Sequence, residues 1–276
     1  MSEADRSTEG TSDPSLPQST EQTDQAARIE GLQGKFADLI EQAQEGNLSP
    51  VILELASHPD LLAEQALWNV LRIKAGEKVP AEYLVLLANI RDAQCPQGCD
   101  PGMMERLRVE AAVRLGGQLR RSENSAVCDD GIVMLDSAIE GFPADTEERW
   151  QHRLLGTAHY ERAMAAVKKE DFAAARDHFA KSIDLSERAE HITGSFQAQE
   201  AQAFHVTAKE GDAQGARMVL AAVVQRTTEA LQTEQDKLRI IELQNTQVNA
   251  AVNWIMAYGT GRSTRRKYLC SSSSRN

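Results

Sequence analysis

This chain of 276 residues has little cysteine, few aromatic residues and no long apolar run. Four cysteines are too few to staple a chain of this size, which excludes the small disulfide-rich class. No segment approaches the roughly 18 consecutive apolar residues of a membrane-spanning helix, so we expect no integral membrane protein. Only 5% of the residues are aromatic, so the core must consist largely of Ala, Leu, Val and Ile, which favours helices.

Positive charge is also scarce, except at the C-terminus. The net charge of −11 argues against nucleic-acid binding by the folded body. Residues 1–25 hold six acids and one base, with Leu16 as the only large aliphatic side chain, so we expect a disordered acidic arm and no signal peptide. Residues 259–276 hold five bases and no acid, which predicts a basic disordered tail. The sequence therefore predicts a cytoplasmic protein whose folded domain spans residues 26–258.

Proline is absent after Pro143, which leaves the second half of the chain free to form long helices. Apolar spacings of three and four predict helices in the first half as well, and no segment has the alternation of a strand. The predicted helices are 29–46, one that begins at Ser49-Pro50, 60–76, one that begins at Pro80, and 104–119. Residues 95–102, rich in Cys, Pro and Gly, are predicted as a loop. The expected fold class is all-α.

A pattern that recurs after 41 residues is the most informative signal. Residues 168–183 align with residues 209–224. The identical pairs are Lys168/Lys209, Asp171/Asp212, Ala175/Ala216, Arg176/Arg217 and Ala180/Ala221. A similar order of small and apolar residues begins at Gly131, 44 residues before Ala175. Recurrence at this spacing predicts a stack of similar helical units.

The repeated residues have sizes that suit helix packing. A small residue in each copy lets a neighbouring helix approach closely, and a large residue one turn later fills the space. The small residues are Gly131, Ala175 and Ala216, and the large ones are Leu135, Phe179 and Leu220. Asp171 and Asp212 stand where the second helix of each pair is expected to begin, so each carboxylate is predicted to cap free N–H groups. The expected unit is a helical hairpin.

Residues 166–185 resemble the turn and second helix of a tetratricopeptide repeat (TPR). The residues that carry this resemblance are Glu170-Asp171-Phe172, Ala175, Phe179 and Ile183. Residues 131–143 are similar, and Trp150, Leu155-Gly156 and Tyr160 are first-helix residue types at wider spacing. The 41-residue unit exceeds the family's usual length of about 34, which helices longer by two turns would explain. The resemblance covers residues 113–228 and implies a TPR-like α-solenoid of antiparallel helical hairpins.

A mostly apolar seam follows the repeats. Its residues are Leu238, Ile241, Asn245, Val248, Val252 and Ile255. We expect the helix 234–258 to pack this seam on the last repeat, as the capping helix that solenoids need. The alternative is a homo-oligomer that pairs the seam of two chains as a coiled coil, because a single Asn in such a seam fixes register.

The sequence gives only weak indications of a catalytic or metal-binding site. Cys95, Cys99 and Cys128 could share a zinc ion or act as redox thiols, but no histidine lies near them in sequence, and free thiols are expected. His152 and His159 are expected to be ordinary helix residues, and no phosphate-loop, dinucleotide-binding or nucleophile-elbow motif occurs. We therefore expect no enzyme, no cofactor and no metal. The alternatives are a regulatory or catalytic protein that uses the three cysteines, or the non-catalytic subunit of a larger enzyme or signalling complex.

The TPR resemblance implies which side chains face the concave groove of such a solenoid. The predicted groove residues are Thr157, Tyr160, Met164 and Lys168 in one unit, and Ala198, Ala201, His205 and Lys209 in the next. Tyr160 and Met164 suit adaptable apolar contact, or else belong to the core between helices. Lys168 and Lys209 favour an acidic peptide, or else complement helix dipoles. The family's carboxylate clamp is not matched, which disfavours a chaperone-tail adaptor, and the expected function is a scaffold that binds a peptide or partner protein.

Overall fold

The computed structural model describes residues 48–57, 81–143, 147–235 and 237–272, which form nine α-helices and one π-helical turn and contain no strand. In chain order they are α2 (Leu48–Ser57), α4 (Ala81–Asp92), α5 (Pro101–Leu119), α6 (Ser125–Gly141), α7 (Arg149–Lys168), α8 (Phe172–Arg188), α9 (Ile192–Gln202), the π-helical turn (Ala203–Thr207), α10 (Ala213–Thr233) and α11 (Lys237–Ser272). The predicted all-α class is confirmed for these ranges. The predicted acidic arm and the predicted helices 29–46 and 60–76 lie outside them.

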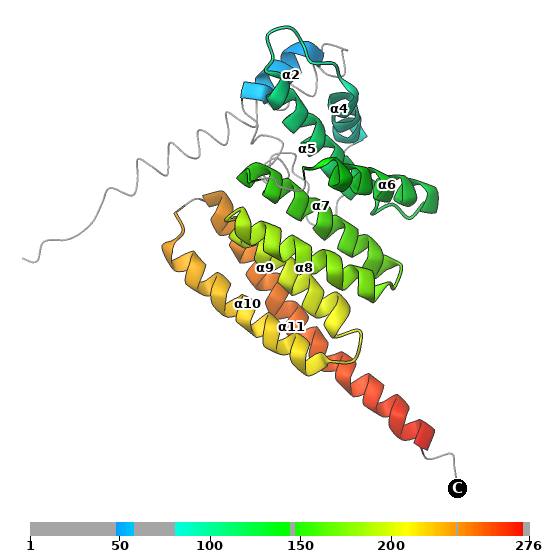
Figure 1. Cartoon of the computed structure of the whole chain (residues 1–276). Coiled ribbons are helices and arrows are strands. Elements are labelled where there is room, and N and C mark those ends of the chain that lie inside the picture. Colours follow the sequence, from blue (N-terminus) through cyan, green and yellow to red (C-terminus); the bar gives the residue numbers. More distant parts are fainter. Residues whose placement is uncertain (1–47, 58–80, 144–146, 236, 273–276) are drawn as a thin grey trace, which may run out of the picture.

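Consecutive helices pack against each other, from α4 and α5 at one end to α10 and α11 at the other (Figure 1). Short connections between them give antiparallel neighbours, as in α7 and α8. Helices two apart in sequence also meet, because α5 contacts α7, α7 contacts α9, and α9 contacts α11. Four alternate helices therefore lie beside one another, and their hairpin partners pack against them.

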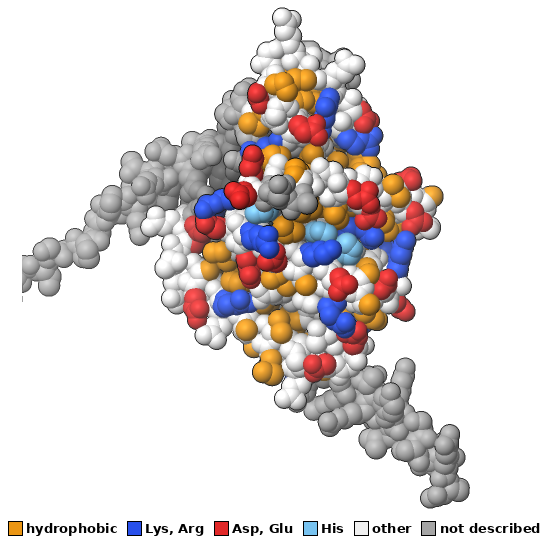
Figure 2. All heavy atoms as spheres, in the orientation of Figure 1, with side chains coloured by type: hydrophobic (Ala, Val, Ile, Leu, Met, Phe, Trp, Pro, Cys, Tyr) orange, Lys and Arg blue, Asp and Glu red, His pale blue; other side chains and the backbone are white. Residues whose placement is uncertain are grey.

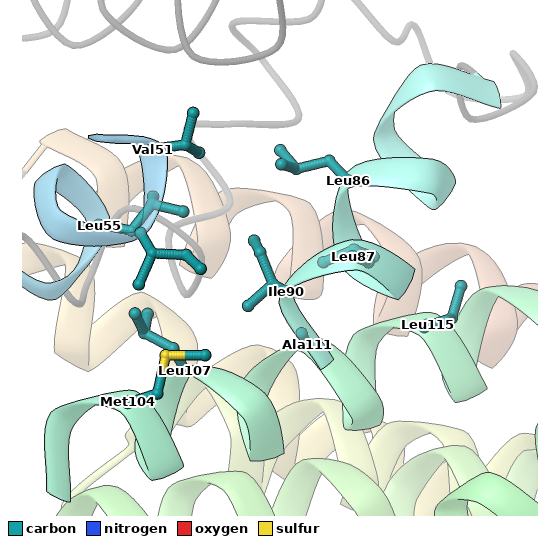
Figure 3. Packing of buried hydrophobic residues seen from close by; sticks show 10 residues of the cluster. Val51, Leu55, Leu86, Leu87, Ile90, Met104, Leu107, Ala111 and Leu115 are labelled. Atoms are coloured by element: carbon teal, nitrogen blue, oxygen red, sulfur yellow. The ribbon is translucent and has the colours of Figure 1, made fainter. Parts of the chain in front are cut away.

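The hydrophobic core is divided into clusters along this stack. At the N-terminal end, α2, α4 and α5 direct Leu55, Ile90 and Leu107 toward one another (Figure 3). A second cluster surrounds Phe179 between α7, α8 and α9, and a third joins Leu220 of α10 to α9 and α11. Each group of neighbouring helices therefore buries its own apolar surface.

The size alternation predicted for the repeated positions is confirmed. Leu135, Phe179 and Leu220 are fully buried, as are Ala175 and Ala216. A side chain added at Gly131 would place its Cβ 2.6 Å from the backbone nitrogen of Arg120, which is closer than atoms can pack. The small residue in α6 is therefore what allows α5 and α6 to approach.

The predicted helix caps are also confirmed. The Asp171 side chain accepts a hydrogen bond from the Ala174 N–H (3.1 Å), and the Asp212 side chain accepts one from the Gly215 N–H (2.8 Å). The residue before each aspartate has a left-handed backbone, with φ of 59° at Glu170 and 102° at Gly211. Equivalent positions of the two copies therefore reverse the chain in the same way.

Three predicted boundaries differ from the structure. α2 begins at Leu48, so Ser49 is inside the helix and is not its N-cap. The loop before α5 ends at Asp100, two residues before the predicted end at residue 102. Asp100 caps α5 by accepting a hydrogen bond from the Met103 N–H (2.8 Å), and Pro101 suits the first helical position. α11 continues through Ser272 instead of ending near residue 258. Residues 259–272 lack proline, and the glycines there retain the backbone N–H groups that a helix needs.

The predicted contact face of the C-terminal helix was wrong. α11 packs against α10 and α9, but through Leu243, Thr246, Ala250 and Ala257, all of which are buried. The seam expected to make this contact faces outward, as Val248 shows. Alanine and threonine let α11 approach more closely than the bulkier seam would allow, which explains the choice of face.

Candidate binding groove

A pocket of about 400 Å³ lies where α5, α7, α9 and α11 come together. Its side chains are mostly polar or charged. They include Glu110, Arg114 and Gln118 from α5, Arg121 from the turn after it, Arg153, Thr157, Tyr160 and Glu161 from α7, Thr193, Gln197 and Glu200 from α9, and Glu242 and Asn249 from α11. Ser182 and Ser186 reach it from α8. The pocket is thus built by alternate helices of the stack, with one hairpin partner contributing small side chains.

Glycine provides much of the space in this groove. A Cβ at Gly117 would lie 3.0 Å from the side chain of Glu161, and a Cβ at Gly194 would lie 2.4 Å from Nδ1 of His191. Gly156 packs against Ser186, and its carbonyl oxygen accepts a hydrogen bond from the Ser182 hydroxyl (2.8 Å). Larger residues at these positions would fill the hollow or push the charged side chains away.

The acidic groups on the α5 side of the groove are already paired with arginine. Glu161 accepts hydrogen bonds from Arg120 and from Nη2 of Arg121 (2.9 Å), and both Glu161 and Arg120 are buried. Nε of Arg114 donates to the carboxylate of Glu110 (2.7 Å), which is buried as well. These pairs place both signs of charge in fixed positions on this wall of the pocket.

Hydroxyl, amide and carboxyl groups line the α9 and α11 side of the pocket. Burial raises the pKa of the Glu200 carboxyl, although this group accepts a hydrogen bond from the Asn253 side chain. The Thr193 hydroxyl donates to Glu242 across the two helices (3.1 Å). Burial also raises the pKa of Tyr160 to about 12, so its hydroxyl stays protonated and can donate a hydrogen bond. This arrangement suits polar recognition.

Of the predicted groove residues, the structure brings Thr157 and Tyr160 into the pocket. Tyr160 also packs edge-on against Phe179, with ring centroids 6.0 Å apart, so it belongs to both the groove and the core. Met164 is partly buried in the cluster around Phe179. Ala198 and Ala201 are buried in that same cluster.

The two predicted groove lysines do not line the pocket. Nζ of Lys168 donates to the Ser122 carbonyl oxygen (2.6 Å) in the connection between α5 and α6. Lys209 is exposed beyond the π-helical turn. His205 lies within that turn beside the ring of Phe204, and burial, followed by the charge of Lys209, lowers its pKa. The recurrence of these lysines therefore marks the ends of helices.

Several groove residues were missed by the sequence analysis. Glu200 lies in α9 and Asn249 in α11, helices whose rotation the apolar pattern alone did not fix, and Arg121 lies in the turn after α5. Arg120, just after the end of α5, pairs with Glu161 in the middle of α7. The offset of 44 residues between the first two copies of the pattern does not relate these positions, so the pattern gave no signal for this pair.

The three cysteines of the alternative lie in the loop before α5 and in α6. Sγ of Cys95 donates to the Cys99 carbonyl oxygen (3.5 Å) in the loop before α5. Cys128 is buried beside Ile132 and Ala165, and its thiol donates to the Arg120 carbonyl oxygen (3.1 Å). Within the described ranges, no three His, Cys, Asp or Glu side chains come together as a metal site would require.

The outer face seen in Figure 2 mixes acidic, basic and apolar side chains without a large area of one sign. None of the helices in the described ranges is long and apolar enough to span a membrane.

Comparisons with protein-family models, with curated proteins and with solved structures found no match to this chain.

Proposed function

We propose that this chain is a protein-interaction module that binds a peptide or partner protein in the groove between α5, α7, α9 and α11. One observation carries this proposal: four helices, separated in the chain by their hairpin partners, direct side chains into a single pocket. The lining combines fixed charges, amides, hydroxyls and the ring of Tyr160, which are the groups that hold a peptide in place. The proposed role is binding and not catalysis.

We further propose that the hairpins form a TPR-like solenoid. The 41-residue offset supports this arrangement, since one ion pair connects two positions that it relates. Arg149 at the start of α7 pairs with Glu190 just before α9, 41 residues later (2.5 Å). Contacts between equivalent positions are expected when similar units stack, and stacked units bind partners along the side lined by alternate helices.

A bulky substitution in the groove tests the proposed function. Thr157 is half-buried in the lining, so Thr157→Trp would fill the pocket without removing a core side chain. Ala180→Trp is the matched control, because it adds the same side chain at an exposed position of α8. Proteins captured from an extract of the source cells by the full chain and by both variants would be quantified by mass spectrometry.

We expect a set of proteins that the wild-type chain and Ala180→Trp retain and that Thr157→Trp loses by at least tenfold. Thermal melting of the three proteins would check that each variant remains folded. If folded Thr157→Trp retained the same partners at the same level, the groove would not be the binding surface.

A further inference from the structure

The outward side of α11 carries a regular apolar seam. Leu238, Ile241, Asn245, Val248, Val252 and Ile255 follow one another at spacings of three and four, so they occupy the a and d positions of a heptad. Among them, Ile241 is 38% exposed, Val248 58%, Val252 47% and Ile255 64%. Four large aliphatic side chains on one helix face therefore remain in contact with water.

The chain uses the opposite side of the same helix for its own packing. Leu243, Ala250 and Ala257 occupy successive f positions, and all three are buried against α10 and α9. Since f lies opposite the boundary between a and d, α11 has one face committed to the bundle and a second that is not required for it. Substitutions in the seam are therefore expected to leave the fold of a single chain intact.

Most of the seam lies in a stretch of sequence that lacks charge. No Asp, Glu, Lys or Arg occurs between Glu242 and Arg262, although 26% of the whole chain is charged. The cores of protein interfaces are depleted of charged residues, whereas a helix face that stays in water usually carries them. In a chain with a net charge of −11, an uncharged stretch is also the place where a second copy can approach with the least repulsion.

We propose that a second copy of this chain packs on the seam, so that two α11 helices form a short parallel coiled coil. The 3.5-residue period is the one that keeps two supercoiled helices in register. Asn245 determines whether the two α11 helices run parallel or antiparallel. In a parallel, in-register pair it lies opposite Asn245 of the other copy, and the two amides can hydrogen-bond. In an antiparallel pair, a positions face d positions, which here are Ile241, Val248 and Ile255, and the amide would be left without a partner.

The mass of the full chain in solution tests this proposal. At about 100 µM, where a dimer of micromolar Kd is populated, light scattering should give about twice the chain mass of 30.3 kDa. The variant Val248→Glu/Ile255→Glu should give the mass of one chain. The matched control Val133→Glu/Ile192→Glu adds the same charge at positions 64% and 55% exposed on α6 and α9, and should remain a dimer. A single-chain mass for the wild type, or an unchanged mass for the seam variant, would overturn the proposal.

The direction of pairing is tested by cross-linking. Asn245→Cys should form a disulfide-linked dimer under air oxidation, in which O₂ accepts the electrons, at least fivefold more than the wild-type chain and than Val133→Cys. Failure of Asn245→Cys to cross-link in a chain that still dimerises would contradict the parallel arrangement. If a single-chain protein bound vesicles of phosphatidylserine and phosphatidylcholine through the seam, a lipid surface would replace the second copy. These outcomes are independent of the groove, because Thr157→Trp leaves the seam unchanged.

Discussion

Glu161 illustrates how one side chain can hold neighbouring hairpins together. It lies in α7, and the guanidinium groups of Arg120 and Arg121 reach it from the end of α5. Arg149 and Glu190 are also 41 residues apart, but both of their side chains are exposed. The two pairs have the same separation in sequence and opposite environments, so comparing them isolates the effect of burial.

We expect Glu161→Ala to lower the free energy of unfolding by about 3–5 kcal/mol, because Arg120 would be left as an unpaired buried charge. Glu190→Ala should change it by only about 0–1 kcal/mol, since water replaces the lost partner. Urea denaturation of both variants measures the difference. Equal effects would mean that burial does not govern these pairs.

Phe179 and Ala175 test the packing between α7, α8 and α9. Phe179→Ala should lower the free energy of unfolding by about 3–5 kcal/mol through the cavity it leaves. Ala175→Leu should lower it by about 1–3 kcal/mol, because the fully buried position has no room for a larger side chain. Ala180→Leu, at an exposed position of α8, is the control and should be nearly neutral. Near-neutral melting shifts at both buried sites would contradict the repeat packing.

At the scale of elements, the backbone conformation that recurs after 41 residues is seen most clearly in the turns before α8 and α10. Glu170 and Gly211 are equivalent residues with a left-handed backbone, but only glycine adopts that conformation without a steric penalty. The turn after α7 is therefore strained at a point where the turn before α10 is not. The repeated aspartates that follow these residues make each turn an efficient helix start.

Placing glycine in the first turn and removing it from the second should have opposite effects on stability. We expect Glu170→Gly to raise the free energy of unfolding by about 0.5–1 kcal/mol, and Gly211→Ala to lower it by about 1 kcal/mol. Denaturation curves of the two variants under the same conditions provide the measurement. Destabilisation by Glu170→Gly would show that the glutamate side chain contributes more than its backbone strain removes.

The capping aspartates are tested separately. Asp171→Ala should lower the free energy of unfolding by about 1 kcal/mol, because the Ala174 N–H loses its acceptor. Asp177→Ala, at an exposed position in the middle of α8, is the control and should change stability by less than about 0.5 kcal/mol. A loss as large for the control would assign the effect to charge and not to capping.

At the scale of the whole molecule, buried and half-buried histidines make the stability of the fold depend on pH. Burial, together with the charges of His178, Lys181 and Arg162, lowers the pKa of His159 to about 4. Burial likewise lowers the pKa of His191 to about 4. His178 and His205 are shifted downward as well, again chiefly by burial. The environments of all four histidine side chains therefore favour the neutral imidazole.

Stability should fall as the pH is lowered from about 6.5 to about 4, because the unfolded chain binds protons there that the folded chain excludes. His159 alone should contribute roughly 1–3 kcal/mol to this loss. Urea denaturation at several pH values measures it, and His159→Asn should reduce the difference between pH 7.5 and pH 4.5. An unchanged pH dependence in this variant would mean that His159 is protonated in the folded protein.

The sequence by itself determined the helices, the small and large positions of the repeat, and the capping of α8 and α10. These features depend on spacing and on backbone chemistry within a few residues, so local patterns such as Asp171 before Ala175 and Phe179 are sufficient. The TPR resemblance named Tyr160 as a groove residue, and its ring lies both in the pocket lining and against Phe179.

Only the tertiary structure decided which face of α11 is buried and which side chains surround the pocket. Both faces of that helix have regular spacing, and the choice depends on how closely α10 can approach Ala250 and Ala257. Lys168 likewise recurs with Lys209, yet the loop beside it supplies the Ser122 carbonyl oxygen that holds it. Contacts between helices depend on their rotation and separation, which a pattern along one helix does not contain.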